Sequence, residues 1–240
     1  MGDIESIIIY TSVAGACIPL GGAFARFEHI RPAWLENEFR HFIIALGGGI
    51  LLAAITFILV PEGIAYLSRP IDAIVFFLLG GIFFFLFELI SGLHRRESPQ
   101  MLAMLLDYIP ESIALGGIFA AGSGTAPLLA LFIGLQNLPE GFNAYREQIK
   151  NKRARPIQVL LLMCAFVPLG PFFGLLGWIF LSEHVYVLGA IMLFASGGIL
   201  YLIFQDIAPQ SKLKRHWAPP LGAVLGFSIG MVGQLWISGT

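Results

Sequence analysis

Charged residues are scarce in this chain. Asp, Glu, Lys and Arg make up 12% of its 240 residues, whereas soluble domains carry about 25%. With 57% hydrophobic residues and a mean hydropathy of +0.83, the chain has too few polar side chains to cover a soluble globule. The net charge of −1 also lacks the basic surplus of a nucleic-acid-binding protein. These shortages exclude a soluble enzyme, a disordered chain and a nucleic-acid partner.

Cysteines and catalytic motifs are also scarce. Cys17 and Cys164 both lie in apolar runs, where small packing residues are expected rather than a disulfide or a metal pair. The apolar runs contain no Ser-His, His-Glu-x-x-His or paired-histidine arrangement. We therefore expect a protein that is not an enzyme and that holds no resident cofactor.

Long apolar runs, by contrast, fill most of the chain. A helix needs about 20 mostly apolar residues to cross a bilayer. Eight stretches meet this need, at about 6–25, 42–67, 71–92, 99–121, 126–146, 157–181, 185–208 and 217–238. The runs are continuously apolar rather than alternating, which favours helices. The predicted fold class is all-α: one polytopic membrane domain, residues 1–240, with eight transmembrane helices.

The basic residues predict the orientation of these spans. Thirteen of the fourteen lie in or beside the first, third, fifth and seventh loops, and Arg69 is alone on the other side. The positive-inside rule therefore places both termini outside. We expect a multi-pass protein of the cell membrane, such as a prokaryotic inner membrane.

Six acidic residues lie inside the predicted spans: Glu62, Glu88, Asp107, Glu111, Glu140 and Asp206. A charge at the bilayer centre costs about 2.5–3.5 kcal/mol, so such residues normally pair with a base or hold a proton or cation. Three have a basic neighbour near the membrane surface: Glu62 with Arg69, Glu88 with Arg95 and Arg96, and Asp206 with Lys212. The other three lack one, which leaves a proton or a metal cation as the partner.

Two of these deep acids lie on the fourth span and one on the fifth. The short turn at 122–125 makes the two spans antiparallel neighbours. At a rise of 1.5 Å per residue, Asp107 and Glu111 lie about 12 and 18 Å from the cytosolic face. Gln136 and Glu140 lie about 15 and 9 Å from that face by the same arithmetic. Polar groups of both spans thus meet near the midplane, where transporters bind their substrates.

A proline–glutamate pattern accompanies these acids. It reads Ile58-Leu59-Val60-Pro61-Glu62-Gly63, Asp107-Tyr108-Ile109-Pro110-Glu111-Ser112 and Gln136-Asn137-Leu138-Pro139-Glu140-Gly141, with a weaker form in Asp206-Ile207-Ala208-Pro209-Gln210. Positions i and i+4 share a helical face, and each proline kinks the helix and frees a carbonyl. Carboxylate, amide and carbonyl oxygens together suit hard divalent cations. The alternative is that the prolines are only kinks and the acids are buried in protonated form.

In this layout the chain resembles the ZIP (ZRT/IRT-like) metal-ion transporters over nearly its whole length. That family has eight spans with both termini outside and carries Pro-Glu motifs on its second, fourth and fifth spans. Gly48-Gly49-Ile50-Leu51-Leu52 and the seventh-span segment Gly198-Ile199-Leu200-Tyr201…Gln205-Asp206-Ile207-Ala208-Pro209 are also similar to family motifs. The resemblance implies a metal site at Asp107, Glu111, Gln136 and Glu140, a second ion near Asn137, and Asp206 as a supplementary ligand or exit-path acid.

The family's motif histidines are replaced in this chain by Ile58, Asp107 and Gln136. An all-oxygen site should favour Mn²⁺ or Fe²⁺ over Zn²⁺. The predicted function is divalent metal-ion transport, with the metal as substrate. The expected partners are that ion, the lipid bilayer and, as a candidate, a second copy of the chain. The alternatives are a proton-coupled carrier or channel that uses the same acids, and a ZIP-like membrane protein that does not transport.

Overall fold

The computed structural model of the chain describes residues 3–28, 33–91, 99–150, 155–212 and 218–238. Its regular elements in these ranges are helices, two of them short π-helices labelled η. In chain order they are α1 (Asp3–Phe27), α2 (Ala33–Ala54), η1 (Ile55–Leu59), α3 (Val60–Ala65), α4 (Pro70–Ser91), α5 (Pro99–Ala120), α6 (Ala126–Lys150), α7 (Pro156–Phe166), α8 (Leu169–Leu181), α9 (Val185–Leu202), η3 (Ile203–Ile207), α10 (Ala208–Gln210) and α11 (Leu221–Ser238).

Six helical segments of the described chain are long and apolar enough to cross a membrane. They are Asp3–Phe27, Asn37–Ala65, Pro70–Ile90, Gln100–Ala120, Pro156–Leu181 and Val185–Gln210. Of the two remaining helices, α11 is apolar but shorter, at Leu221–Trp236. The other, α6, has 25 residues but carries polar side chains along its length. The chain is thus all-α, with the length and composition of a multi-pass membrane protein.

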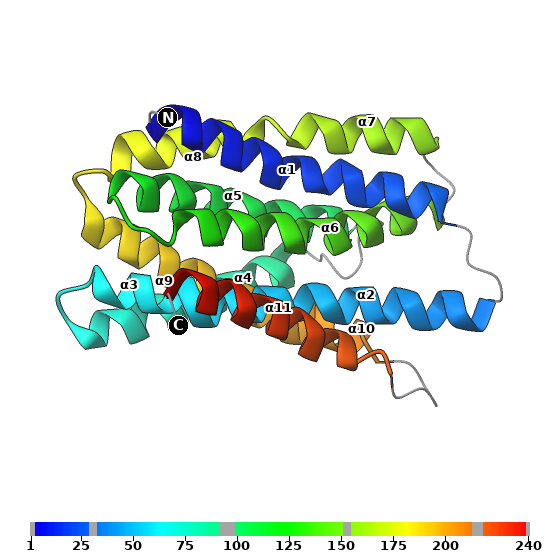
Figure 1. Ribbon diagram of the computed structural model, residues 1–240. Coiled ribbons are helices and arrows are strands. Elements are labelled where there is room, and N and C mark those ends of the chain that lie inside the picture. Colours follow the sequence, from blue (N-terminus) through cyan, green and yellow to red (C-terminus); the bar gives the residue numbers. More distant parts are fainter. Residues whose placement is uncertain (1–2, 29–32, 92–98, 151–154, 213–217, 239–240) are drawn as a thin grey trace.

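The helices form two layers (Figure 1). The upper layer contains α1, α5, α6, α7 and α8, in which α1 packs on α6 and α5 packs on α8. The lower layer contains α2, η1, α3, α4, α9, η3, α10 and α11, in which α2 packs on α11 and α4 packs on α9. The layers meet where α2 contacts α6 and where α5 contacts α9.

Both chain termini lie at the same end of the molecule, on the left in Figure 1. The turn between α5 and α6 lies there too, and we call this the turn end. At this end α5 stops and α6 begins, so residues late in α5 and early in α6 lie near it.

The motif prolines follow two different local geometries. Pro61 and Pro209 are each the second residue after the end of a π-helix, η1 and η3 respectively. Pro110 and Pro139 instead lie inside the continuous helices α5 and α6. A proline has no N–H to donate, and a π-turn is one way in which a helix accommodates such a defect. The proline pattern of the sequence does not distinguish the two geometries.

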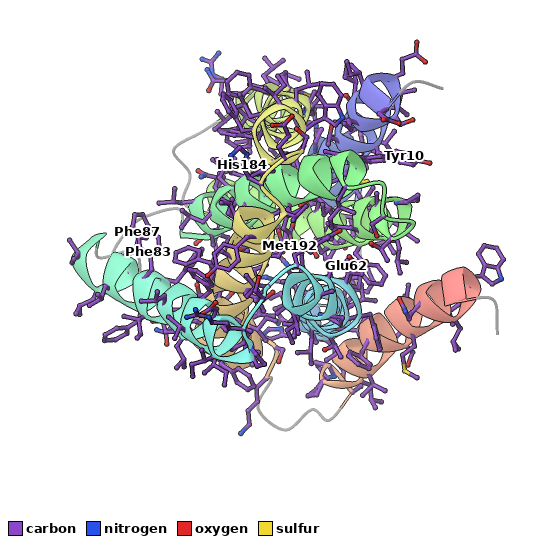
Figure 2. All side chains as sticks on the ribbon, turned by 90° about the vertical axis from the view of Figure 1, so that its left-hand side faces the viewer. Tyr10, Glu62, Phe83, Phe87, His184 and Met192 are labelled. Atoms are coloured by element: carbon purple, nitrogen blue, oxygen red, sulfur yellow. The ribbon has the colours of Figure 1, made fainter. Side chains whose placement is uncertain are left out.

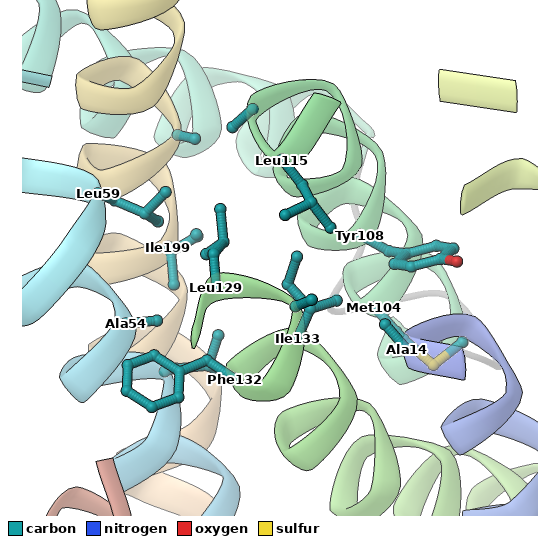
Figure 3. Packing of buried hydrophobic residues seen from close by; sticks show 14 of the residues in the cluster. Ala14, Ala54, Leu59, Met104, Tyr108, Leu115, Leu129, Phe132, Ile133 and Ile199 are labelled. Carbon is teal, nitrogen blue, oxygen red and sulfur yellow. The ribbon is translucent and has the colours of Figure 1, made fainter. Parts of the chain in front are cut away.

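Large apolar side chains fill the space between the layers near the turn end. Leu59 and Ile199 from the lower layer meet Leu115, Leu129 and Phe132 from the upper layer (Figure 3), and each is at most 1% exposed. We call these five residues the apolar seal. On the outside of the molecule, Phe83 of α4 (labelled in Figure 2) is 49% exposed, although its ring also lies 5.4 Å from that of Phe194 of α9. Such exposed apolar side chains suit contact with lipid.

Candidate cation site

A cavity of about 60 Å³ lies between the two layers, on the side of the apolar seal away from the turn end. Residues of α2, α5, α6 and α9 through α10 line it. Six lining side chains are polar: Gln100, Asp107, Glu140, Asn143, Asp206 and Gln210. Three carboxylates and three amides therefore share one small space, and the described lining contains no Lys, Arg or His.

Several oxygens of these side chains have no donor among the described residues. They are Asp107 Oδ1, both Glu140 carboxylate oxygens, Gln100 Oε1 and Asn143 Oδ1. Buried polar atoms are nearly always hydrogen-bonded in native proteins, and each exception needs an explanation. All five atoms are acceptors, so a protein donor, a proton or a cation would satisfy them. The chemistry of this lining therefore suits a positively charged occupant.

Asp107 and Glu140 are held in this environment by well-packed helices. Asp107 is 5% exposed, and the charges of Glu111 and Asp206 act on it. Glu140 experiences the charges of Asp107 and Glu111 in the same way. The described residues show no ion pair between Asp107 or Glu140 and a Lys, Arg or His. Like charges in a dry site repel one another, so a bound cation would relieve the strain.

Glu111 and Gln136 form a pair one helical turn nearer the turn end. The Gln136 Nε2 group donates to both Glu111 carboxylate oxygens, at 2.7 and 2.6 Å. Both side chains are 0% exposed and neither lines the cavity. Gln136 Oε1 has no partner among the described residues. The pair thus extends the polar region beyond the cavity, although Glu111 has an amide partner and Asp107 has none at Oδ1.

Asn137 points away from the cavity. Its Nδ2 donates to the Ala14 carbonyl oxygen at 3.0 Å, and Tyr108 likewise donates to the Thr11 carbonyl oxygen at 3.2 Å. These contacts tie α6 and α5 to α1. In this arrangement Asn137 fixes the packing of the site rather than lining it.

Asp206 lines the cavity from the lower layer. It lies in η3, where the π-turn precedes Pro209, and its side chain is partly exposed. The cavity therefore takes carboxylates from both layers: Asp107 and Glu140 from the upper layer and Asp206 from the lower. Within the described residues, no group of three or more His, Cys, Asp or Glu side chains is placed so that it could hold a metal ion. A bound ion would need amide oxygens as well, or a rearrangement of the side chains.

Two polar residues that line the cavity, Gln100 and Asn143, lie outside the motifs of the sequence. Asn143 lies three residues after Glu140, and Gln100 seven residues before Asp107, so the helical repeat could have placed both on the face of the site. Gln210 reaches it from α10, and Gln100 Nε2 donates to Gln210 Oε1 at 2.7 Å across the layers. No periodicity within one span could have predicted that contact.

A further carboxylate, Glu147, is bonded to the lining residue Gln100 but is not itself part of the lining. Its Oε2 accepts a hydrogen bond from the Gln100 backbone N–H at 3.2 Å. Burial raises the pKa of Glu147, whereas this hydrogen bond and the charge of Arg40 act in the opposite direction. A fourth acid thus lies next to the cavity lining.

The acids nearer the ends of the spans have partners. Glu62 accepts hydrogen bonds from Ser123 and Thr125, and the described residues show no ion pair between it and Arg69. Glu88 accepts hydrogen bonds from Tyr201 at 2.6 Å and Gln205 at 3.3 Å. The predicted partners of Glu88, Arg95 and Arg96, lie outside the described residues. Polar side chains of neighbouring helices thus stabilise these two acids.

Comparison with known proteins gives no assignment: no family model and no curated protein matches the chain. The likeness to ZIP transporters therefore depends on the four sequence motifs. The function has to be argued from the cavity itself.

Proposed function

We propose that the chain carries a divalent metal cation across the membrane, and that the cation binds in the cavity between the two layers. Asp107 and Glu140 would provide the carboxylate oxygens, with Asp206 as a third acid and the amide oxygens of Gln100 and Asn143 completing the shell. The observation that carries the proposal is the set of five buried acceptor oxygens without a donor among the described residues. The Glu111–Gln136 pair would take part once the cation displaces the amide.

The proposed membrane arrangement has eight spans with both termini outside, as in the ZIP family. Two features of the fold support adding α6 and α11 to the six apolar segments. α6 packs along α1 and is joined to α5 by a short turn, and its polar residues are mostly buried against other helices. α11 packs along α2. The start of α1 and the end of α11 lie at the same end of the molecule, which fits eight crossings but not seven.

The expected cargo is Mn²⁺ or Fe²⁺ in preference to Zn²⁺. The described lining of the cavity offers oxygen donors and no imidazole or thiolate. Hard oxygen ligands suit Mn²⁺, whereas sites that select Zn²⁺ commonly use His or Cys. The proposed ZIP-like transporter would therefore differ from family members with motif histidines in metal preference.

Thermal unfolding of the purified protein tests the proposal. Mn²⁺ should raise the unfolding temperature, because a ligand at 100 times its Kd stabilises by about 2.7 kcal/mol. Asp107→Asn and Glu140→Gln should abolish this rise. Both variants should also be at least as stable as the parent without metal, because each removes a buried charge that has no partner.

The matched control is Asp72→Asn, which changes an acid of α4 far from the cavity. Asp72 accepts a hydrogen bond from Tyr186 within the lower layer, so this variant should keep the full Mn²⁺ effect. If Asp107→Asn kept it as well, the cavity would not be the metal site.

A proton-coupled carrier is the second candidate, favoured by the absence of a formed three-residue metal shell among the described residues. In that case the acids would hold protons, and Mn²⁺ would not stabilise the protein at any concentration. Proteoliposomes would then acidify in response to a pH gradient without metal, and Asp107→Asn would stop this.

A further inference from the structure

A polar contact joins the two layers at the turn end. Glu62 of α3 accepts hydrogen bonds from Ser123 Oγ at 2.9 Å and from Thr125 Oγ1 at 2.8 Å, both at its Oε1 atom. Glu62 belongs to the lower layer, whereas both hydroxyls belong to the α5–α6 turn of the upper layer. Figure 2, viewed from the turn end, shows Glu62 between the two layers.

The hydrogen bonds of this contact are suited to forming and breaking reversibly. Each hydroxyl has a single proton, and both protons can be donated to the carboxylate. Hydrogen bonds to an ionised acceptor are stronger than neutral ones. Glu62 is only partly buried, and such exposure keeps the net contribution of a charged contact small. The contact can therefore hold the layers together without making their separation prohibitive.

The α5–α6 turn positions the two hydroxyls. Gly122 ends α5 with a φ of +70°, a conformation that favours glycine. The Ser123 N–H donates back to the Ile118 carbonyl oxygen at 3.2 Å, and the Thr125 carbonyl oxygen accepts from Leu129 N–H as α6 begins. Within the turn, Ser123 Oγ lies 2.9 Å from Thr125 Oγ1 and accepts from the Thr125 backbone N–H at 3.3 Å, so the two hydroxyls are held side by side, facing Glu62.

Polar and apolar zones follow one another between the layers. Going inward from the turn end, the Glu62 contact comes first and the apolar seal second. The Glu111–Gln136 pair and then the cavity follow. Gln100 and Gln210 border the cavity on the side away from the turn end. A cation at Asp107 is therefore separated from the turn end by the Glu111–Gln136 pair, the seal and the Glu62 contact. On the other side, the cavity lining includes the polar side chains of Gln100 and Gln210 beside apolar ones.

We infer that Glu62, Ser123 and Thr125 form a latch that closes the outer mouth of the site. Resting on the proposed function, the inference assigns these three residues to gating of the metal's access from outside. When the latch opens, the layers part at the turn end and the apolar seal admits water. The latch residues do not bind the metal in the cavity; they control which side of the membrane it can reach.

Thiol labelling from outside tests the latch. The reporter is Leu129→Cys, in the seal, in a background in which Cys17 and Cys164 are changed to serine. A membrane-impermeant maleimide should label it slowly in the parent protein, in vesicles without metal. Glu62→Ala should speed labelling by about tenfold or more, and Ser123→Ala with Thr125→Val should do the same while keeping the carboxylate.

The matched control is Asp72→Asn, which replaces a hydrogen-bonded carboxylate with an amide at the same end but within the lower layer. It should leave labelling unchanged. A second reporter, Ala54→Cys, changes side-chain volume little and lies opposite Phe132 (Figure 3), so it reads the same opening if Leu129→Cys disturbs packing. Unchanged labelling at both reporters in the latch variants, or equal acceleration in Asp72→Asn, would overturn the latch.

Mn²⁺ flux in the same vesicles separates this inference from the proposed function. Fast labelling with no Mn²⁺ flux in any variant would leave the latch standing and remove the metal carrier. Normal Mn²⁺ flux with unchanged labelling would support the metal carrier and rule out the latch.

Discussion

Two ways of burying a carboxylate occur side by side in this site. The Glu111 carboxylate has a neutral amide donor in Gln136, which satisfies both of its oxygens. Both oxygens of Glu140 lack a donor among the described residues. The first arrangement stabilises the fold in the absence of any ion. The second arrangement lowers the stability of the protein when the site is empty, because ionised oxygens are buried without a donor. A bound cation would remove this penalty.

The Glu111–Gln136 pair gives a prediction about stability. Gln136→Leu should destabilise the protein by about 1–3 kcal/mol, because it leaves a fully buried carboxylate without its donor. Adding Glu111→Leu should recover most of the loss, since removing both partners leaves no orphan. Thermal unfolding in detergent would measure this cycle. A double variant no more stable than Gln136→Leu would show that Glu111 has another essential partner.

The missing imidazole gives a prediction about selectivity. Asp107→His places a nitrogen ligand where Asp107 lines the cavity, and imidazole suits Zn²⁺ better than carboxylate does. The Zn²⁺ concentration that halves Mn²⁺ uptake should be at least tenfold lower in this variant than in the parent protein. Asp72→His provides the control, with unchanged competition. If Zn²⁺ already outcompeted Mn²⁺ in the parent and Asp107→His did not change this, oxygen ligands at Asp107 would not set the preference.

The sequence was informative about individual helices and less so about their neighbours. The helical rise and the short turn placed Glu111 and Gln136 at similar depths of adjacent helices, and the structure joins the two by hydrogen bonds. It did not reveal that Asn137, next to Gln136, turns to the Ala14 carbonyl. Side-chain direction on a helix follows from the sequence, but the identity of the helix on that side depends on tertiary packing.

Close helix packing in each layer depends on glycines, and Gly116 offers a test. A Cβ at Gly116 would lie 1.8 Å from the Gly174 carbonyl oxygen of α8. Gly116→Ala should therefore push α5 away from α8 and destabilise the protein by about 1–3 kcal/mol. Gly124→Ala is the matched control, because a Cβ there meets nothing within 4 Å. Equal unfolding temperatures for the two variants would show that α5 and α8 can separate freely.

At the scale of the whole molecule, the division into two layers could not be predicted from the sequence. Hydropathy marks where the chain is apolar, and the described part of each of the eight apolar stretches is mostly helical. Helices that pack together, such as α2 and α11, are far apart in the chain. No repeating pattern in the sequence indicates that they are neighbours. The layering decides the site, because the cavity takes Asp107 from one layer and Asp206 from the other.

The eight-span arrangement predicts on which side of the membrane each loop lies. If α6 crosses the membrane, Ser182, in the turn after α8, lies outside and Ser211, after α10, lies in the cytosol. If α6 does not cross, both positions exchange sides, because every later segment reverses. Single cysteines at the two positions, without Cys17 and Cys164, should therefore react oppositely with an impermeant maleimide in intact cells. Ser182→Cys should label at once and Ser211→Cys only after permeabilisation, and the reverse pattern would rule out α6 as a span.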